Sequence, residues 1–69
     1  MTLPELAYLV GATATAAYSY RLNYVALGEI MLAEAGAEAC AAGYGTTDPE
    51  WVGRYAIEYG DITPEGELN

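Results

Sequence analysis

The sequence predicts an all-α protein, and three observations support this class. Alanine, the residue with the highest helix propensity, recurs throughout the N-terminal half. No proline occurs between Pro4 and Pro49, so nothing in that stretch removes a backbone donor from a helix. Residues that cap helix N-termini precede each of these prolines. We expect one small helical unit over residues 1–69, with a long helix over about 3–42, a short helix over about 49–59 and an extended acidic tail over 61–69.

The long helix is predicted to begin at a capping box. Thr2 accepts a hydrogen bond from the amide of Glu5, whose side chain accepts from the amide of Thr2. Pro4 is tolerated because first-turn amides have no partner within the helix. Glycines around Tyr44 provide the stop near residue 42. Between these ends, alternating spacings of four and three residues place one apolar stripe along the helix: Leu6, Val10, Thr13, Ala17, Tyr20, Tyr24, Leu27 and Met31.

The long helix is apolar on more than one face. A second stripe, offset from the first, consists of Leu9, Ala12, Ala16, Ala26, Ile30, Ala33 and Ala37. Helices of this kind are normally buried by neighbours on several sides. The alternative is a compact three-helix bundle with a corner near residues 19–23, but that segment contains no glycine or proline to turn the chain.

The short helix also begins at a capping signal. Either Thr47 forms a capping box, or Asp48 is the cap and Pro49 is the first helical residue. Gly60 marks the end of this helix. Its predicted inner face consists of Val52, Tyr55, Ala56 and Tyr59, and its charged face of Glu50, Arg54 and Glu58 at i, i+4 spacing. The tail over 61–69 should become ordered only where it docks on a surface.

Composition excludes several classes of function. The chain has one cysteine, Cys40, and no histidine, so an intramolecular disulfide and a Cys/His zinc site are both ruled out. Acidic residues number 10 against 2 basic ones, for a formal charge of −8. This balance argues against binding to nucleic acid and to anionic lipid headgroups. A small chain without a disulfide or a structural metal depends for its stability on helix packing or on assembly with protein partners.

The candidate groups for chemistry, a pair of glutamates and the cysteine, are better explained as structural. Glu34 and Glu38 lie one helical turn apart, but without histidine this pair is typical of a solvated acidic face. Cys40 lies among alanines and is expected to be a small buried apolar residue. We therefore predict no enzymatic activity and no catalytic, metal or cofactor site.

The uncharged segment over residues 6–20 raises the question of a membrane. It spans about 15 residues and is diluted by Thr13, Thr15 and Ser19, whereas a transmembrane helix needs about 20 apolar residues. No basic segment precedes it, so it does not resemble a secretory signal. A single-pass or peripheral membrane component, with residues 6–28 in or on the bilayer, is the runner-up interpretation.

The predicted helices differ greatly in length. At 1.5 Å per residue the long helix would span about 60 Å and the short one about 16 Å. The short helix would then leave most of the apolar surface of the long helix uncovered, and such surface predicts a partner.

Arg21 has no acidic neighbour at helical spacing, so a buried Arg21 would need a carboxylate from elsewhere. Our candidate is the tail over 61–69 of a neighbouring copy; the alternative is a solvated arginine.

Seven tyrosines and one tryptophan also favour an interface, because these side chains are enriched where proteins meet. The predicted interface consists of Leu6, Val10, Ala17, Tyr20, Arg21, Tyr24, Leu27, Met31, Trp51, Tyr55 and Tyr59.

Together these features predict a non-enzymatic structural subunit of a larger protein particle, which packs through the long helix rich in small residues and tyrosine. In its alanine, glycine and tyrosine content the long helix is similar to small virion proteins of bacterial and archaeal viruses, although it shares no motif with them and lacks the basic C-terminus of filamentous coat peptides. That resemblance implies a virion or cytoplasmic assembly. The alternatives are the membrane component described above and an acidic inhibitor of a basic protein.

Overall fold

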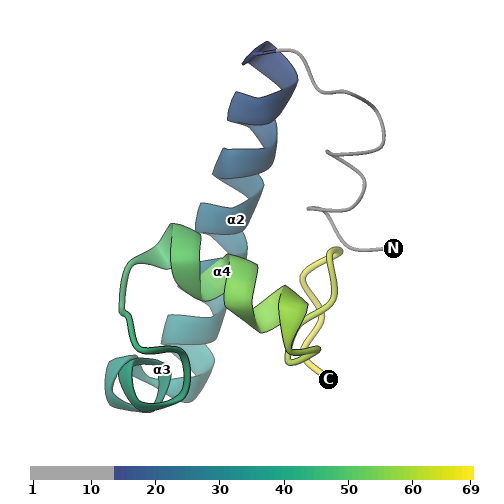
Figure 1. Cartoon of the computed structure of the whole chain (residues 1–69). Coiled ribbons are helices and arrows are strands. Elements are labelled where there is room, and N and C mark those ends of the chain that lie inside the picture. Colours follow the sequence, from purple (N-terminus) through teal and green to yellow (C-terminus); the bar gives the residue numbers. More distant parts are fainter. Residues whose placement is uncertain (1–13) are drawn as a thin grey trace.

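A computed structural model describes residues 14–69 of the chain (Figure 1). Three helices follow one another: α2 (Ala14–Ala35), α3 (Ala37–Tyr44) and α4 (Pro49–Glu58). Helix α4 lies across α2, and α3 lies at the C-terminal end of α2. Within residues 14–69 there is no strand, only an isolated antiparallel bridge between Ile62 and Leu68. The all-α prediction is confirmed, whereas the predicted capping box at Thr2 lies outside the described residues.

The expected continuous helix is interrupted at Gly36. This residue has φ 91°, a backbone conformation that favours glycine, and it separates α2 from α3. Hydrogen bonds continue across the break, because the amide of Gly36 donates to the carbonyl of Leu32 and that of Cys40 donates to the carbonyl of Gly36, each over 3.1 Å. Helix α3 ends at Tyr44, and the next residue, Gly45, has a left-handed backbone conformation and donates to the carbonyl of Ala41.

Helix α4 begins with an Asp48 cap, one of the two predicted signals. The Asp48 carboxylate accepts from the amide of Glu50 over 3.0 Å, and Pro49 is the first helical residue. The hydroxyl of Thr46 accepts from the amide of Asp48 over 3.1 Å, which holds the preceding loop. The helix ends at Glu58, one residue before the predicted end.

The core lies between α2 and α4 and is closed at one end by α3 and the tail. Its buried side chains are Tyr24, Leu27, Met31, Cys40, Val52, Ala56, Ile57 and Ile62. Val52 and Ala56 were predicted to face inward, but Tyr59 is exposed and Ile57 takes the inner position instead. The short helix covers the central part of α2, because the chain bends at Gly36 and α4 crosses the helix instead of lying along its end.

Two glycines bring the backbones of α2 and α4 into direct contact. A Cβ atom at Gly53 would overlap the carbonyl oxygen of Tyr24 and lie 2.9 Å from the amide nitrogen of Gly28. A Cβ atom at Gly28 would overlap the carbonyl oxygen of Pro49. The crossing of the two helices therefore requires glycine at both positions.

The C-terminal segment folds back on the chain's own core. Ile62 is only 1% exposed, and its amide donates to the carbonyl of Ala56 over 3.2 Å. The segment turns between Thr63 and Gly66, whose amide donates to the Thr63 carbonyl over 2.9 Å. Gly66 also approaches the Leu27 side chain of α2, where an added Cβ would lie 3.3 Å away. The predicted tail is thus a docked loop and forms part of the fold.

Candidate functional site

Four aromatic side chains form a continuous surface that we call the aromatic face: Tyr44, Trp51, Tyr55 and Tyr59. The last three follow one another at i, i+4 spacing along α4, so they lie in one row. Ring centroids are 5.9 Å apart for Trp51 and Tyr55 and 6.3 Å apart for Tyr55 and Tyr59. Tyr44, from the end of α3, stacks on Tyr59 with centroids 5.9 Å apart and rings only 6° from parallel.

The aromatic face is open to solvent at both ends of its row. Trp51 is 47% exposed and Tyr59 is 64% exposed, while Tyr44 and Tyr55 are half-buried between them. Contacts with neighbouring rings restrict the side-chain rotamers, so a partner that binds this surface meets rings that are already ordered.

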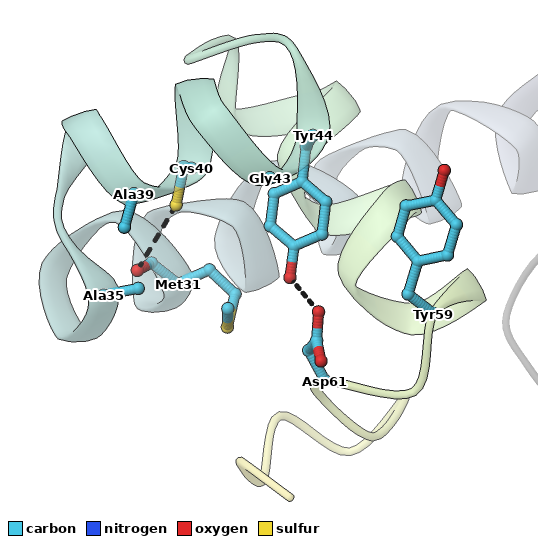
Figure 2. A pocket seen from close by; sticks show the side chains of 8 residues that line it. All are labelled: Met31, Ala35, Ala39, Cys40, Gly43, Tyr44, Tyr59 and Asp61. Atoms are coloured by element: carbon cyan, nitrogen blue, oxygen red, sulfur yellow. Dashed lines mark hydrogen bonds between the residues drawn. The ribbon is translucent and has the colours of Figure 1, made fainter.

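A groove, which we call the Tyr44 groove, adjoins the aromatic face (Figure 2). Its volume is about 320 Å³. Its lining is mostly apolar and consists of Met31, Ala35, Ala39, Cys40, Gly43, Tyr44, Tyr59 and Asp61. A second hollow shares four of these residues and extends the groove past Glu34 towards Leu68 and Asn69. Asp61 and Glu34 are the charged groups that line these hollows.

Tyr44 and Asp61 are joined at the rim of this groove. The Tyr44 hydroxyl donates a hydrogen bond to the Asp61 carboxylate, as Figure 2 shows. Burial and this hydrogen bond raise the pKa of Tyr44 well above its usual value, so the hydroxyl remains a donor at neutral pH. The bond holds one carboxylate oxygen of Asp61 and leaves the other able to accept from a ligand.

An ion-pair network lies beside the aromatic face. Glu50 accepts from Nε of Arg21 over 3.2 Å and from an Nη atom of Arg54 over 3.1 Å. The Arg54 guanidinium also lies over the rings of Tyr24 and Trp51, at 4.5 and 5.3 Å from their centroids. Burial raises the pKa of Tyr24, and the positive charge of Arg54 partly opposes that shift.

This network gives Arg21 a partner within its own chain. Arg21 pairs with Glu50 and its side chain is 61% exposed, which agrees with the alternative of a solvated arginine, whereas a carboxylate from a neighbouring copy stays a prediction. Arg21 and Glu50 are 29 positions apart, so the pair forms only when α4 crosses α2. No signal within a single helix points to Glu50 as the partner of Arg21.

We expect Glu50→Gln to lower the free energy of unfolding by about 1 kcal/mol, because two arginines lose their anionic partner while their positive charges remain close together. Urea unfolding followed by circular dichroism would measure the change. Glu58→Gln removes an exposed carboxylate from the same helix and is the matched control. Equal midpoints for the two variants would contradict a stabilising role for the network.

Apart from Arg21, which pairs with Glu50, the predicted interface residues fall into three groups. Trp51, Tyr55 and Tyr59 lie together on the aromatic face. By contrast, Tyr24, Leu27 and Met31 are buried in the core of the chain itself, and Tyr20 is partly buried against this core. The surface that these four residues offer to a partner is therefore small or absent. Leu6, Val10 and the side chain of Ala17 lie outside the part that the structure describes.

Tyr44 and Asp61 were missed by sequence reasoning. The glycines on either side of Tyr44 marked it only as part of a helix stop, and Asp61 was assigned to the tail. Cys40 is buried, as predicted, with Sγ 3.8 Å from the Met31 carbonyl. Over residues 14–69, the structure contains no cluster of acidic or cysteine side chains that could hold a metal ion.

No helix in the described part of the chain combines the length and the apolar character needed to cross a membrane. Comparisons with protein families, with curated proteins and with solved structures found no match to this chain.

Proposed function

We propose that this chain is a non-enzymatic assembly subunit that docks on another protein through the aromatic face. The observation that carries the proposal is the exposure of Trp51 and Tyr59 in one ordered row of stacked rings. Aromatic side chains contribute disproportionately to binding when they are buried at the centre of an interface. Because the rings are already ordered, docking would cost little side-chain entropy.

The position of the face within the fold also supports a docking role. Other residues of α4 fill the core, because Val52 and Ala56 are fully buried whereas Trp51 and Tyr59 are exposed. Trp51 and Tyr59 are therefore not needed to fill the core. Large assemblies, including virus particles, are settings in which a small subunit of this kind would contribute such a surface.

The test is the size of the species that contains the chain in an extract of its native source. We expect size-exclusion chromatography with light scattering to give the species that contains the wild-type chain a mass well above the 7.3 kDa of one chain. A Trp51→Ser, Tyr59→Ser double variant should migrate at the mass of a single chain. Leu22→Ser, which alters an exposed apolar residue of α2, is the matched control and should leave the complex intact.

Circular dichroism would establish that the double variant keeps its helices. A wild-type chain that migrates as a single molecule in the extract would contradict the proposal. Recovery of the complex only in detergent would support a membrane component instead.

A further inference from the structure

The charges of the chain indicate what kind of partner the aromatic face would meet. Both arginines are bonded to Glu50, and the sequence contains no lysine. Of the nine acidic residues within 14–69, Glu50 alone contacts an arginine. A second copy would bring the same net charge of −8 and arginines that are already paired, so self-docking would be opposed by repulsion.

The Tyr44 groove adds a specific chemical preference. Met31, Ala35 and Ala39 line it with apolar side chains that suit an apolar stem, and the Asp61 carboxylate lines the same groove. Tyr44 and Tyr59 line the same hollow with aromatic rings. Arginine combines an apolar stem with a planar cation that stacks on rings and bonds to carboxylates.

We propose that the partner is a basic protein and that one of its arginine side chains occupies the Tyr44 groove, with the guanidinium at Asp61. This inference rests on the proposed docking function. The Tyr44 hydroxyl is a positioning group, because its hydrogen bond orients the Asp61 carboxylate. Glu34 lines the adjoining hollow together with Asp61 and adds a second negative charge near the proposed site.

The chain already uses this mode of recognition internally. Arg54 lies over two aromatic rings, of Tyr24 and Trp51, and pairs with the Glu50 carboxylate. The groove presents the same two kinds of group, rings and a carboxylate, but without a cation of its own among residues 14–69. An incoming arginine would supply that cation.

The experiment is a titration of the purified full chain with a polyarginine peptide at physiological ionic strength. Trp51 is the only tryptophan and lies on the aromatic face, so its fluorescence reports binding nearby. We expect saturable binding that is tighter for polyarginine than for polylysine of the same length, and no binding of polyglutamate. Asp61→Asn should weaken polyarginine binding about tenfold, the effect of losing one charge-assisted hydrogen bond.

Two further variants separate a specific site from general attraction. Glu29→Gln removes the same charge from an exposed position that does not line the groove, and it should change the dissociation constant less than about twofold. Ala35→Leu fills the groove without changing the charge and should also weaken binding. Amide NMR spectra would show that each variant keeps the fold. Equal losses for Asp61→Asn and Glu29→Gln, or unchanged binding by Ala35→Leu, would overturn the inference.

The two proposals can fail separately. If polyarginine does not bind but the native complex still depends on Trp51 and Tyr59, the arginine inference is wrong and the assembly proposal stands. If polyarginine binds in the groove but the native extract contains only single chains, the assembly proposal is wrong.

Discussion

Replacing Gly53 with alanine should destabilise the chain by about 3 kcal/mol or more, which is a large share of the stability of so small a domain. The added Cβ would overlap the carbonyl oxygen of Tyr24 and crowd the amide of Gly28. These are backbone atoms of a helix, so they cannot move aside as a flexible side chain would. The two helices would have to separate, and the core between them would lose contacts along its whole length.

Urea unfolding followed by Trp51 fluorescence and by circular dichroism would measure this loss. Gly28→Ala should behave similarly, because its Cβ would overlap the carbonyl oxygen of Pro49. Gly43→Ala is the matched control: it lies within α3, a Cβ there meets no atom within 4 Å, and alanine should stabilise the helix by about 0.5–1 kcal/mol. If Gly53→Ala unfolds at the wild-type midpoint, the helices do not cross as closely as described.

Replacing Ile62 with alanine should lower the free energy of unfolding by about 3 kcal/mol. Its side chain is among the largest that are fully buried, and it lies in the segment that sequence analysis assigned to a tail. The substitution would leave a cavity beneath the docked loop and remove the main apolar anchor that holds residues 61–69 in place. Because Asp61 precedes Ile62, the same change should also loosen the Tyr44 groove.

Leu68→Ala is the control for this substitution, since Leu68 pairs with Ile62 in the isolated bridge but is 46% exposed. We expect it to cost less than about 1 kcal/mol. Chemical denaturation would compare the two variants, and hydrogen exchange at the amide of Ile62 would report release of the loop. A loss for Ile62→Ala no greater than that for Leu68→Ala would show that the segment is not part of the core.

The docked loop links stability to the proposed binding site. Asp61 reaches Tyr44 because the amides of Asp61 and Ile62 both donate to the carbonyl of Ala56 at the end of α4. The groove therefore combines residues from α2, α3, the C-cap of α4 and the loop, and no single helix presents it alone. This dependence explains why the proposed arginine site requires a folded chain.

Local signals in the sequence were sufficient for the class of fold and for the start of α4. The Asp48 side chain accepts from an amide of the first helical turn, and Pro49 has no amide hydrogen that needs a partner. The start of α4 is therefore set by neighbouring residues. The i, i+4 spacing of Trp51, Tyr55 and Tyr59 is likewise local, because a helix brings such positions together whatever surrounds it. Whether these rings face the core or the solvent is not local, and Tyr59, expected to face inward, is exposed.

Gly36 illustrates why the break in the long helix was not predicted. Gly28 and Gly36 both lie in alanine-rich sequence, and nothing local distinguishes them. Gly28 stays helical under the close contact with α4, whereas Gly36 adopts positive φ where no atom would meet its Cβ. Long-range packing therefore decides at which glycine the helix is interrupted.

The sequence by itself determined the helical class, a helix start within residues 47–49 and the spacing that aligns the aromatic residues, since each arises from interactions within a few residues of chain. Only the tertiary structure decided that Tyr24, Leu27 and Met31 form a core, that Arg21 pairs with Glu50 and that Tyr44 meets Asp61. An apolar stripe has the same pattern whether its own chain or another protein covers it. Contacts between residues far apart in sequence depend on how the helices cross, and here that crossing is set by the close approach of two glycines.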